Sequence, residues 1–204
     1  MACEQKQRPV QSCQMLPDVV SSEQQSLVLV KKLLAIAVSS ITYLRGLFPE
    51  KAYGRKYVGE LKVLILREHS CPGAQQIVQC CAWFFCHKNG QSLTKMACDN
   101  TQKSSMLLVR KLYMLMQNLG PLPDNICLNM KLFYYDDVTP QEYQPPGFKD
   151  DDSETLIFER EPVNLTMGEV VTPFHSLKMS VTTERECMKK ENVITDAGIE
   201  YSGE

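Results

Sequence analysis

The sequence predicts an α+β fold in which three or more helices pack on one face of a mostly antiparallel sheet. Residues 103–119 place apolar side chains at helical spacing, and the run stops at Gly120 and Pro121. Residues 125–135 then alternate between two faces, as a strand does. A long apolar helix followed by one strong strand predicts a nucleus in which the helix packs on a sheet. The residues after 148 are then expected to pack on that sheet.

Residues 22–48 predict the central helix of this domain. Ser22 is a favourable N-cap with Gln25 as a capping-box partner, and Pro49 is expected to end the helix. Two adjoining apolar stripes cover most of its circumference, which indicates burial on several sides. A coiled coil would carry charges at the flanking positions, and because they are absent we favour a core helix.

The remaining elements are predicted to be short. Residues 60–67 read as a second helix, and residues 74–85 read as a third, with Pro72 tolerated in its first turn. Residues 156–158 and 175–182 read as strands, and the second of these alternates clearly. The domain is therefore expected to span residues 21–186, with an unmatched stretch at about 82–100.

Both ends of the chain are expected to be flexible. Residues 1–20 are rich in Gln and show no periodicity, which favours a disordered tail over a short edge strand at residues 15–16. Residues 187–204 are charged and aperiodic and are expected to fray. No signal-peptide pattern opens the chain, and the uncharged stretch at residues 33–44 is short for a membrane span.

Composition argues against several function classes. A formal charge of −2 gives no general attraction to nucleic acid, and the basic doublets at residues 31–32, 110–111 and 189–190 are isolated. No phosphate-binding glycine loop or nucleophile motif is present, and His69, His87 and His175 lie in unrelated contexts. We therefore expect no enzyme, and direct DNA binding remains a weaker alternative.

The nine cysteines favour reduced thiols in a cytosolic or nuclear protein, because no secretion signal accompanies them. A zinc site would have to use Cys81, Cys86, His87 and Cys98. Their spacing departs from the closely paired ligands of structural zinc sites, so buried thiols are the favoured interpretation. We expect no metal and no other cofactor.

Several longer motifs resemble one family. The helix from Glu23 to Leu34 that runs into Ile41-Thr-Tyr-Leu-Arg-Gly-Leu-Phe-Pro-Glu50 resembles the first helix of a HORMA domain. Residues 20–80 and 101–186 resemble the meiosis-specific branch of that family, whose members are found on chromosome axes. The stretches that carry this resemblance are Leu115-Met-Gln-Asn-Leu-Gly-Pro-Leu-Pro123, Met130-Lys-Leu-Phe-Tyr-Tyr-Asp136, Tyr143-Gln-Pro-Pro-Gly-Phe148, Val171-Thr-Pro-Phe-His175 and Val181-Thr-Thr-Glu-Arg185.

The resemblance implies an adaptor rather than an enzyme. HORMA domains bind a short extended peptide, the closure motif, as an added strand, and a C-terminal "safety belt" wraps over it. The sheet edge then corresponds to residues 126–135, and the belt corresponds to residues 155–185. The implied peptide-binding residues are Leu128, Met130, Leu132 and Tyr134. The implied belt residues are Leu156, Phe158, Phe174, Leu177 and Met179.

The same resemblance implies partners and a location. The partners are closure motifs of axis proteins or of other HORMA-domain chains, an AAA+ ATPase that engages the tail at residues 1–20, and chromatin through those partners. The location is the nucleus, on unsynapsed meiotic axes, with roles in double-strand-break formation, homologue pairing and checkpoint signalling. No membrane and no small-molecule substrate are implied.

Two departures from the family pattern stand out. Residues 82–100 occupy the place of a long β-hairpin region that family members contribute to the sheet, and meiotic members continue into a long tail with a closure motif of its own. The chain therefore reads as a shortened product, either an alternatively spliced or a mispredicted form, with an incomplete sheet that leaves apolar faces uncovered. The alternative function is a non-functional or dominant-negative form that occupies partners without assembling.

Overall fold

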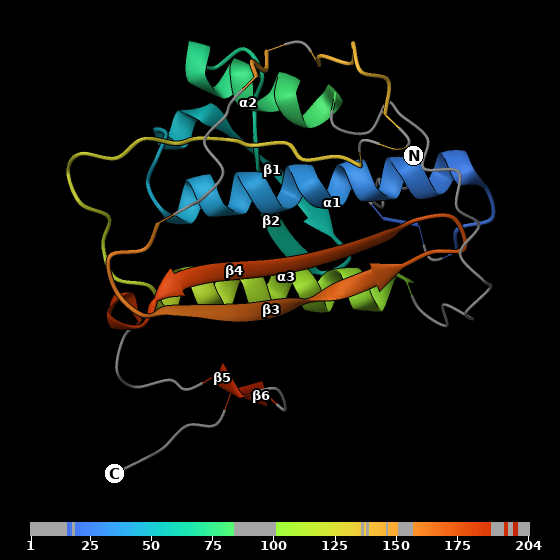
Figure 1. The fold of residues 1–204 in the computed structure, drawn as a ribbon. Helices are drawn as coiled ribbons and strands as arrows, with labels where there is room; N and C mark the ends of the chain where they lie inside the picture. Colours follow the sequence, from blue (N-terminus) through green and yellow to red (C-terminus); the bar gives the residue numbers. More distant parts are fainter. Residues whose placement is uncertain are drawn as a thin grey trace, which may run out of the picture.

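Helix α1 (Glu23–Leu44) runs through the middle of the computed structural model (Figure 1). The structure describes residues 16–17, 19–83, 101–135, 137, 139–145, 147–150, 157–188, 194–195 and 198–199. The Ser22 side chain accepts a hydrogen bond from the Gln25 backbone N–H at 3.2 Å, which confirms the predicted N-cap. The Gln25 side chain instead accepts from the Ser21 backbone N–H, so the reciprocal half of the capping box forms one residue earlier.

The predicted end of α1 at residue 48 was wrong, because the helix ends at Leu44. Gly46 adopts a left-handed conformation with φ of 68° and donates to the Tyr43 carbonyl, while Leu47 donates to the Thr42 carbonyl. These two hydrogen bonds form a Schellman motif, for which glycine has no steric penalty. Gly46, three residues before Pro49, was therefore the stronger stop signal.

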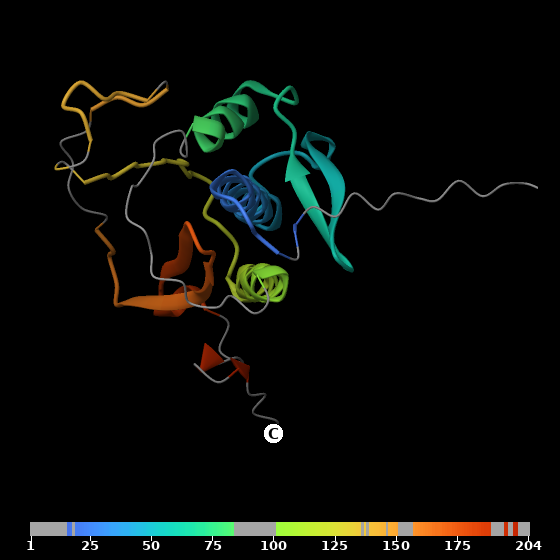
Figure 2. The ribbon, with the colours of Figure 1, turned by 90° about the vertical axis from the view of Figure 1, so that its right-hand side faces the viewer.

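Other elements surround α1. Seen along its axis, α2 (Pro72–Trp83) and α3 (Thr101–Asn118) flank it on two sides, and a β-hairpin lies on a third (Figure 2). By length and apolar composition α1 could also cross a membrane, with a mean hydropathy of 1.8. Its buried residues, among them Leu29, Leu33 and Ile36, belong instead to a packed core. Such burial is typical of a core helix.

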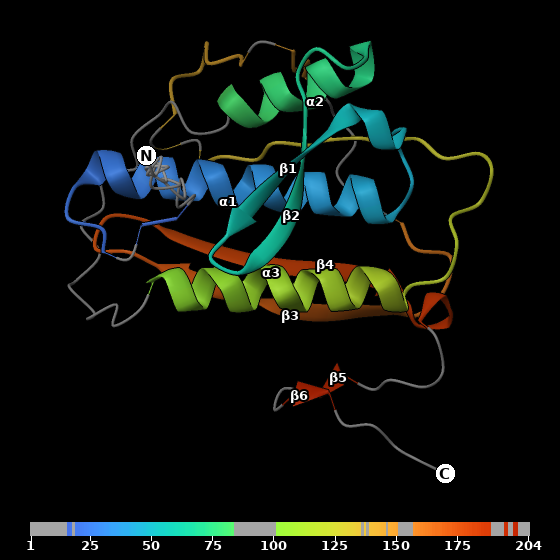
Figure 3. The ribbon, with the colours of Figure 1, turned by 180° about the vertical axis from the view of Figure 1, so that it is seen from behind.

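The hairpin is formed by β1 (Tyr53–Val58) and β2 (Leu61–Leu66), so the helix predicted at residues 60–67 was wrong. Val58 pairs with Leu61, which leaves a two-residue turn with Gly59 at φ of 58°. A glycine at the first position of a two-residue turn is the signature of a tight hairpin. The hairpin crosses α1 and its turn reaches α3 (Figure 3), where a Cβ on Gly59 would meet Met106 Sδ at 3.2 Å.

A second hairpin packs against α1 and α3. It consists of β3 (Pro162–Val171) and β4 (Ser176–Glu184), and it confirms the final strand predicted at residues 175–182. The register shifts between Thr166 and Gly168, so Met167 forms a bulge. The bulge shifts the alternation of inward-facing side chains by one residue, so that both Met167 and Val170 are buried.

The predicted α+β class is confirmed, and the sheet is incomplete as expected. In the described part of the chain the strands form three separate two-stranded sheets, of which the third joins β5 (Ile194–Thr195) and β6 (Gly198–Ile199). Short 3₁₀ helices η1 (Glu50–Ala52) and η2 (Arg185–Cys187) precede β1 and follow β4. Helices α2 and α3 confirm the predictions at residues 74–85 and 103–119 to within a few residues.

Residues 125–135 do not form the predicted strand. They run as a nearly straight trace past α1 (Figures 1 and 2), without a backbone ladder to any described segment. A strand requires a partner for its N–H and C=O groups, and alternation alone does not supply one. Of the strand predicted at residues 156–158, Leu156 lies outside the described residues and residues 157–158 are irregular.

The ordered domain begins before residue 21. Leu16 and Val20 are buried in the main core cluster, next to Leu29 and Leu33 of α1. Residues 1–15 of the predicted tail lie outside the described residues. The core thus includes the last part of the segment expected to be a tail.

Candidate functional site

A groove of about 570 Å³ follows the extended segment that the sequence assigned to peptide binding. One wall consists of residues 129–134, and the other consists of residues 143–145 and 147–150. Two turns in the second wall direct the chain back, with Tyr143 N donating to Pro140 O at 2.9 Å and Phe148 N donating to Pro145 O at 3.1 Å. The proline-rich stretch thus forms the second wall.

One aromatic contact joins the two walls of the groove. The rings of Tyr134 and Tyr143 meet edge to face with centroids 5.6 Å apart, and the Tyr134 hydroxyl donates to the Tyr143 carbonyl at 3.3 Å. Edge-to-face aromatic pairs are favourable because of the ring quadrupole. This contact holds the two segments at a defined separation.

Three of the four predicted peptide-binding residues line the groove, namely Met130, Leu132 and Tyr134. Leu128 does not line it, and its side chain is 56% exposed. All six consecutive residues from 129 to 134 contact the groove, although alternate side chains of an extended segment point to opposite faces. The groove therefore follows the backbone edge of the segment, and an extended peptide can add as a strand along such an edge.

The predicted belt residues lie mainly on the β3–β4 hairpin, away from the groove. Phe174, Leu177 and Met179 are half-buried and pack against the main core cluster, next to α1 and α3. Phe158 is half-buried ahead of β3, and Leu156 lies outside the described residues. The structure thus brings three of the five belt residues together on a docked hairpin.

The tip of this hairpin is fastened to the first turn of α1 by side chains that the sequence did not reveal. Ser26 Oγ lies 2.5 Å from Thr172 Oγ1 and 2.7 Å from His175 Nδ1. Thr172 Oγ1 also donates to the His175 carbonyl at 2.7 Å and accepts from the His175 N–H at 2.8 Å. We call Ser26, Thr172 and His175 the belt latch.

The belt latch is structural rather than catalytic. A serine oxygen next to a histidine nitrogen is the pairing used in nucleophilic catalysis. Ser26 and Thr172 are both buried, at 0% and 1% exposure, so a substrate has no route to the serine oxygen. Buried hydroxyl groups must find hydrogen-bond partners, and here they find each other.

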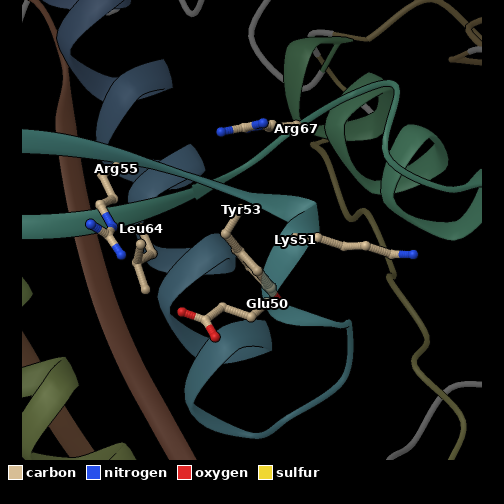
Figure 4. A pocket seen from close by; sticks show the side chains of 6 residues that line it. All are labelled: Glu50, Lys51, Tyr53, Arg55, Leu64 and Arg67. Atoms are coloured by element: carbon tan, nitrogen blue, oxygen red, sulfur yellow. The ribbon is translucent and has the colours of Figure 1, made fainter.

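A basic pocket of about 390 Å³ lies on the outer side of the β1–β2 hairpin (Figure 4). Lys51, Arg55 and Arg67 contribute to its lining together with one carboxylate, Glu50. Among the described residues no salt bridge involves these four side chains. The pocket therefore carries an excess of positive charge that is open to solvent.

Tyr53 lines the same pocket and has an altered ionisation. Burial raises the pKa of its phenol above the ordinary value of 10.0, neighbouring Cys71 and Tyr43 raise it further, and Thr42 opposes them. Among the residues that the structure describes, the Tyr53 hydroxyl nevertheless has no hydrogen-bond partner. Since the Thr42 hydroxyl donates to carbonyls of its own helix, we regard its interaction with Tyr53 as a weak polar contact.

The zinc interpretation involves residues that the structure largely leaves undescribed. Cys81 is buried in α2, whereas Cys86, His87 and Cys98 lie outside the described residues. Within the described ranges no group of three or more His, Cys, Asp or Glu side chains is arranged to hold a metal.

Comparison with known proteins places these features in a family. The sequence model of the HORMA domain matches residues 26–85 and 82–175, in two stretches that meet at the end of α2. HORMA domain-containing protein 1 of Danio rerio is 63% identical over an alignment that covers 99% of this chain and 79% of the relative. The protein of the same name from Sus scrofa is 48% identical, covering 93% of this chain and 59% of the relative.

The zebrafish alignment occupies 281 positions against the 204 residues of this chain, which leaves at least 77 positions without a counterpart here. The chain spans less than two thirds of the length of the mammalian relative. Among solved structures, Caenorhabditis elegans HTP-1 bound to the HIM-3 closure motif has a TM-score of 0.74 at 16% identity, covering 87% of this chain and 97% of that one. That likeness concerns the fold.

Proposed function

Because this chain belongs to the HORMA-domain family, we propose that it is a protein-interaction adaptor that binds a closure-motif peptide along residues 129–134. The groove that these residues line carries the proposal. An extended peptide would add there as a strand, with main-chain hydrogen bonds giving affinity and Met130, Leu132 and Tyr134 giving selectivity. HTP-1, which shares this fold, is bound to the HIM-3 closure motif in its structure, and this supports a closure motif as the ligand class.

The belt in this proposal is the β3–β4 hairpin with the residues that lead into it. Belt closure over a peptide would make release slow, because release would require the hairpin to leave α1 and α3. Leaving would break the belt latch at Ser26 and withdraw Met167 and Val170 from the core. Affinity would therefore be controlled mainly through the dissociation rate.

A remodelling ATPase would act on the N-terminal tail. Pulling on residues 1–15 would first draw Leu16 and then Val20 out of the core cluster that also contains Leu29 and Val170 of β3. Removing these side chains would weaken the layer between α1 and the belt hairpin. A pulling force on the tail would thus be coupled to belt release through Leu16 and Val20.

In cells the proposed role is that of a meiotic chromosome-axis protein in the nucleus, acting in break formation, homologue pairing and checkpoint signalling. The curated relatives named HORMA domain-containing protein 1 support this assignment. A tagged chain expressed in spermatocytes should mark unsynapsed axes. A diffuse nuclear signal would contradict axis binding and favour the interfering form, which occupies soluble partners without assembling.

Peptide binding can be tested with short fluorescent peptides that tile the zebrafish relative. At least one peptide should remain with the chain through gel filtration and give saturable fluorescence anisotropy. Leu132→Asp should abolish this binding, because it places a charge in the groove. The matched control Leu122→Asp, at an exposed position outside the groove, should bind normally. The assigned groove would be contradicted if both variants bound normally, or if both lost binding equally.

The basic pocket supports a second, weaker candidate, direct contact with DNA. Lys51, Arg55 and Arg67 form no salt bridge with another described residue, and they could neutralise phosphates. A gel shift with duplex DNA should then weaken steeply with salt, and Arg55→Gln should reduce the slope by about one. Binding that is independent of salt or of Arg55 would exclude this surface.

A further inference from the structure

The basic pocket beside the β1–β2 hairpin is built on a fixed base. Tyr53 and Leu64 form the apolar part of its lining, and the Tyr53 ring packs edge to face on Tyr43 of α1 with centroids 5.1 Å apart. Only 5% of Tyr53 is exposed. Strand β2 is also tied to α1, because the Leu66 backbone N–H donates to Ser39 Oγ at 3.0 Å. The charged side chains of the pocket therefore start from a well-held surface.

Two arginines are brought to the pocket by the hairpin. Arg55 lies two residues after Tyr53 on β1, and alternate residues of a strand share a face. Arg67 directly follows β2, and its backbone N–H donates to the Ala52 carbonyl at 2.9 Å. In Figure 4 the side chain of Lys51 points away from both arginines. The two guanidinium groups are therefore the main candidates to bind a ligand in the pocket.

Gly54 allows Arg67 to lie across the start of β1. A Cβ at Gly54 would meet Arg67 Nε at 3.0 Å and Nη2 at 3.5 Å, so the guanidinium packs directly over the Gly54 backbone. This packing orients the group without an ion pair, since neither Arg55 nor Arg67 forms a salt bridge with another described residue. A planar guanidinium can bind a phosphate group through two parallel N–H···O bonds.

The pocket fits a single phosphate group better than it fits DNA. Its volume is about 390 Å³, and its charged lining consists of Arg55, Arg67, Lys51 and the carboxylate of Glu50. Duplex DNA presents a row of phosphates, with one charge per about 1.7 Å of helix axis, and it attracts surfaces with a large excess of positive charge. This chain has a formal charge of −2. A phosphorylated side chain instead concentrates a charge of about −1.5 to −2 on one group.

We propose that Arg55 and Arg67 bind the phosphate of a phosphorylated serine or threonine on a partner protein, with Leu64 contacting apolar atoms next to that phosphate. The site lies on the β1–β2 hairpin, whereas closure-motif binding is proposed along residues 129–134. The two proposals therefore stand independently, and failure of one leaves the other intact. Binding at the hairpin would depend on the phosphorylation state of the partner.

Nuclear magnetic resonance of the ¹⁵N-labelled chain tests the site through its arginine Nε–H signals. The probe is a short peptide of alanine and glycine with a central phosphoserine, and the same peptide with serine is its control. The phosphopeptide should shift the signals of Arg55 and Arg67 saturably, whereas the exposed Arg110 of α3 should not respond. The serine peptide should shift none of them. Absence of a shift at Arg55 and Arg67, or an equal shift at Arg110, would overturn the proposal.

Three substitutions separate a shaped site from general charge. Arg67→Gln should weaken phosphopeptide binding by about tenfold or more, because it removes a charge-assisted contact. Gly54→Ala should weaken it several-fold with the charge unchanged, because the added Cβ displaces the guanidinium of Arg67. Lys56→Gln is the matched control, since Lys56 is exposed next to Arg55 but points to the other face of β1, and it should bind normally. Equal weakening by Lys56→Gln and Arg67→Gln, with unfolding curves unchanged, would overturn the site.

Competition with duplex DNA distinguishes the two ligands considered for this pocket. A short duplex should not displace the phosphopeptide at an equal concentration of phosphate groups. Displacement by the duplex that is lost in Arg55→Gln would overturn the proposal and favour DNA as the ligand of the pocket.

Discussion

Replacing Ser26 by alanine tests how the belt hairpin is held. The substitution deletes an oxygen that contacts Thr172 Oγ1 at 2.5 Å and His175 Nδ1 at 2.7 Å, at a position with no solvent exposure. A hydrogen bond contributes about 0.5–1.5 kcal/mol net. Thr172 keeps its bonds to the His175 backbone, and the half-buried His175 ring can turn to water. We therefore expect a loss of about 1.5 kcal/mol, from two modest bonds.

The assay is urea unfolding of the reduced chain, followed by circular dichroism, with a thermal melt in parallel. A loss of this size should lower Tm by about 3–6 °C for a chain of this length. Ser40→Ala is the matched control, since Ser40 is equally buried in α1 but donates only to the Ile36 carbonyl of its own helix at 2.6 Å. Removing such a bond costs little.

Two results would refute this reasoning. The first is a loss for Ser26→Ala no larger than that for Ser40→Ala. The second concerns the double substitution of Ser26 and His175 by alanine. Because the two side chains share one interaction, their combined loss should be smaller than the sum of the single losses. Strict additivity would mean that the Ser26–His175 contact contributes nothing.

Three further predictions concern packing, a turn and ionisation. Leu112→Ala should lower the unfolding free energy by about 2–5 kcal/mol because the side chain is fully buried. Leu107→Ala, at 48% exposure on the same helix, should change it by under about 0.5 kcal/mol. Urea unfolding curves measure both values. Gly59→Ala should lower the unfolding free energy by about 1 kcal/mol or more because φ is 58°, whereas Gly120→Ala should be nearly neutral. Because the pKa of Tyr53 is raised in the folded state, the phenol of the unfolded chain loses its proton at a lower pH than that of the folded chain. The folded state is therefore progressively destabilised as the pH rises above 10. Tyr53→Phe should shift alkaline unfolding, followed by circular dichroism, to higher pH, and an unchanged midpoint would contradict this.

The helices could be predicted from the sequence because their signals are local. The Ser22 cap and the apolar periodicity of α1 and α3 each depend on residues within a few positions of one another. The β1–β2 hairpin was missed because Leu61, Leu64 and Ile65 also fit helical spacing. Gly59 between two apolar runs was the signal that could have decided the matter.

The candidate site could be predicted only in part. Motif resemblance located Met130, Leu132 and Tyr134, which line the groove. The second wall and the belt latch depend on contacts that no local pattern encodes, since Ser26 and His175 are 149 residues apart in sequence. The alternation at residues 125–135 predicted a strand wrongly, because a strand depends on a pairing partner elsewhere and not on side-chain alternation alone.

The β3–β4 hairpin is fastened at both of its ends. Its tip is held by the latch to the start of α1, and its open end leads to Cys187, whose carbonyl accepts from the Gly120 N–H at 2.8 Å. The Gly120 carbonyl in turn accepts from Arg45 Nη2 at 2.7 Å, at the end of α1. A segment held at two points cannot peel away from one end. Its amides should therefore exchange with deuterium together, as one cooperative unit, rather than in a gradient that begins at the tip.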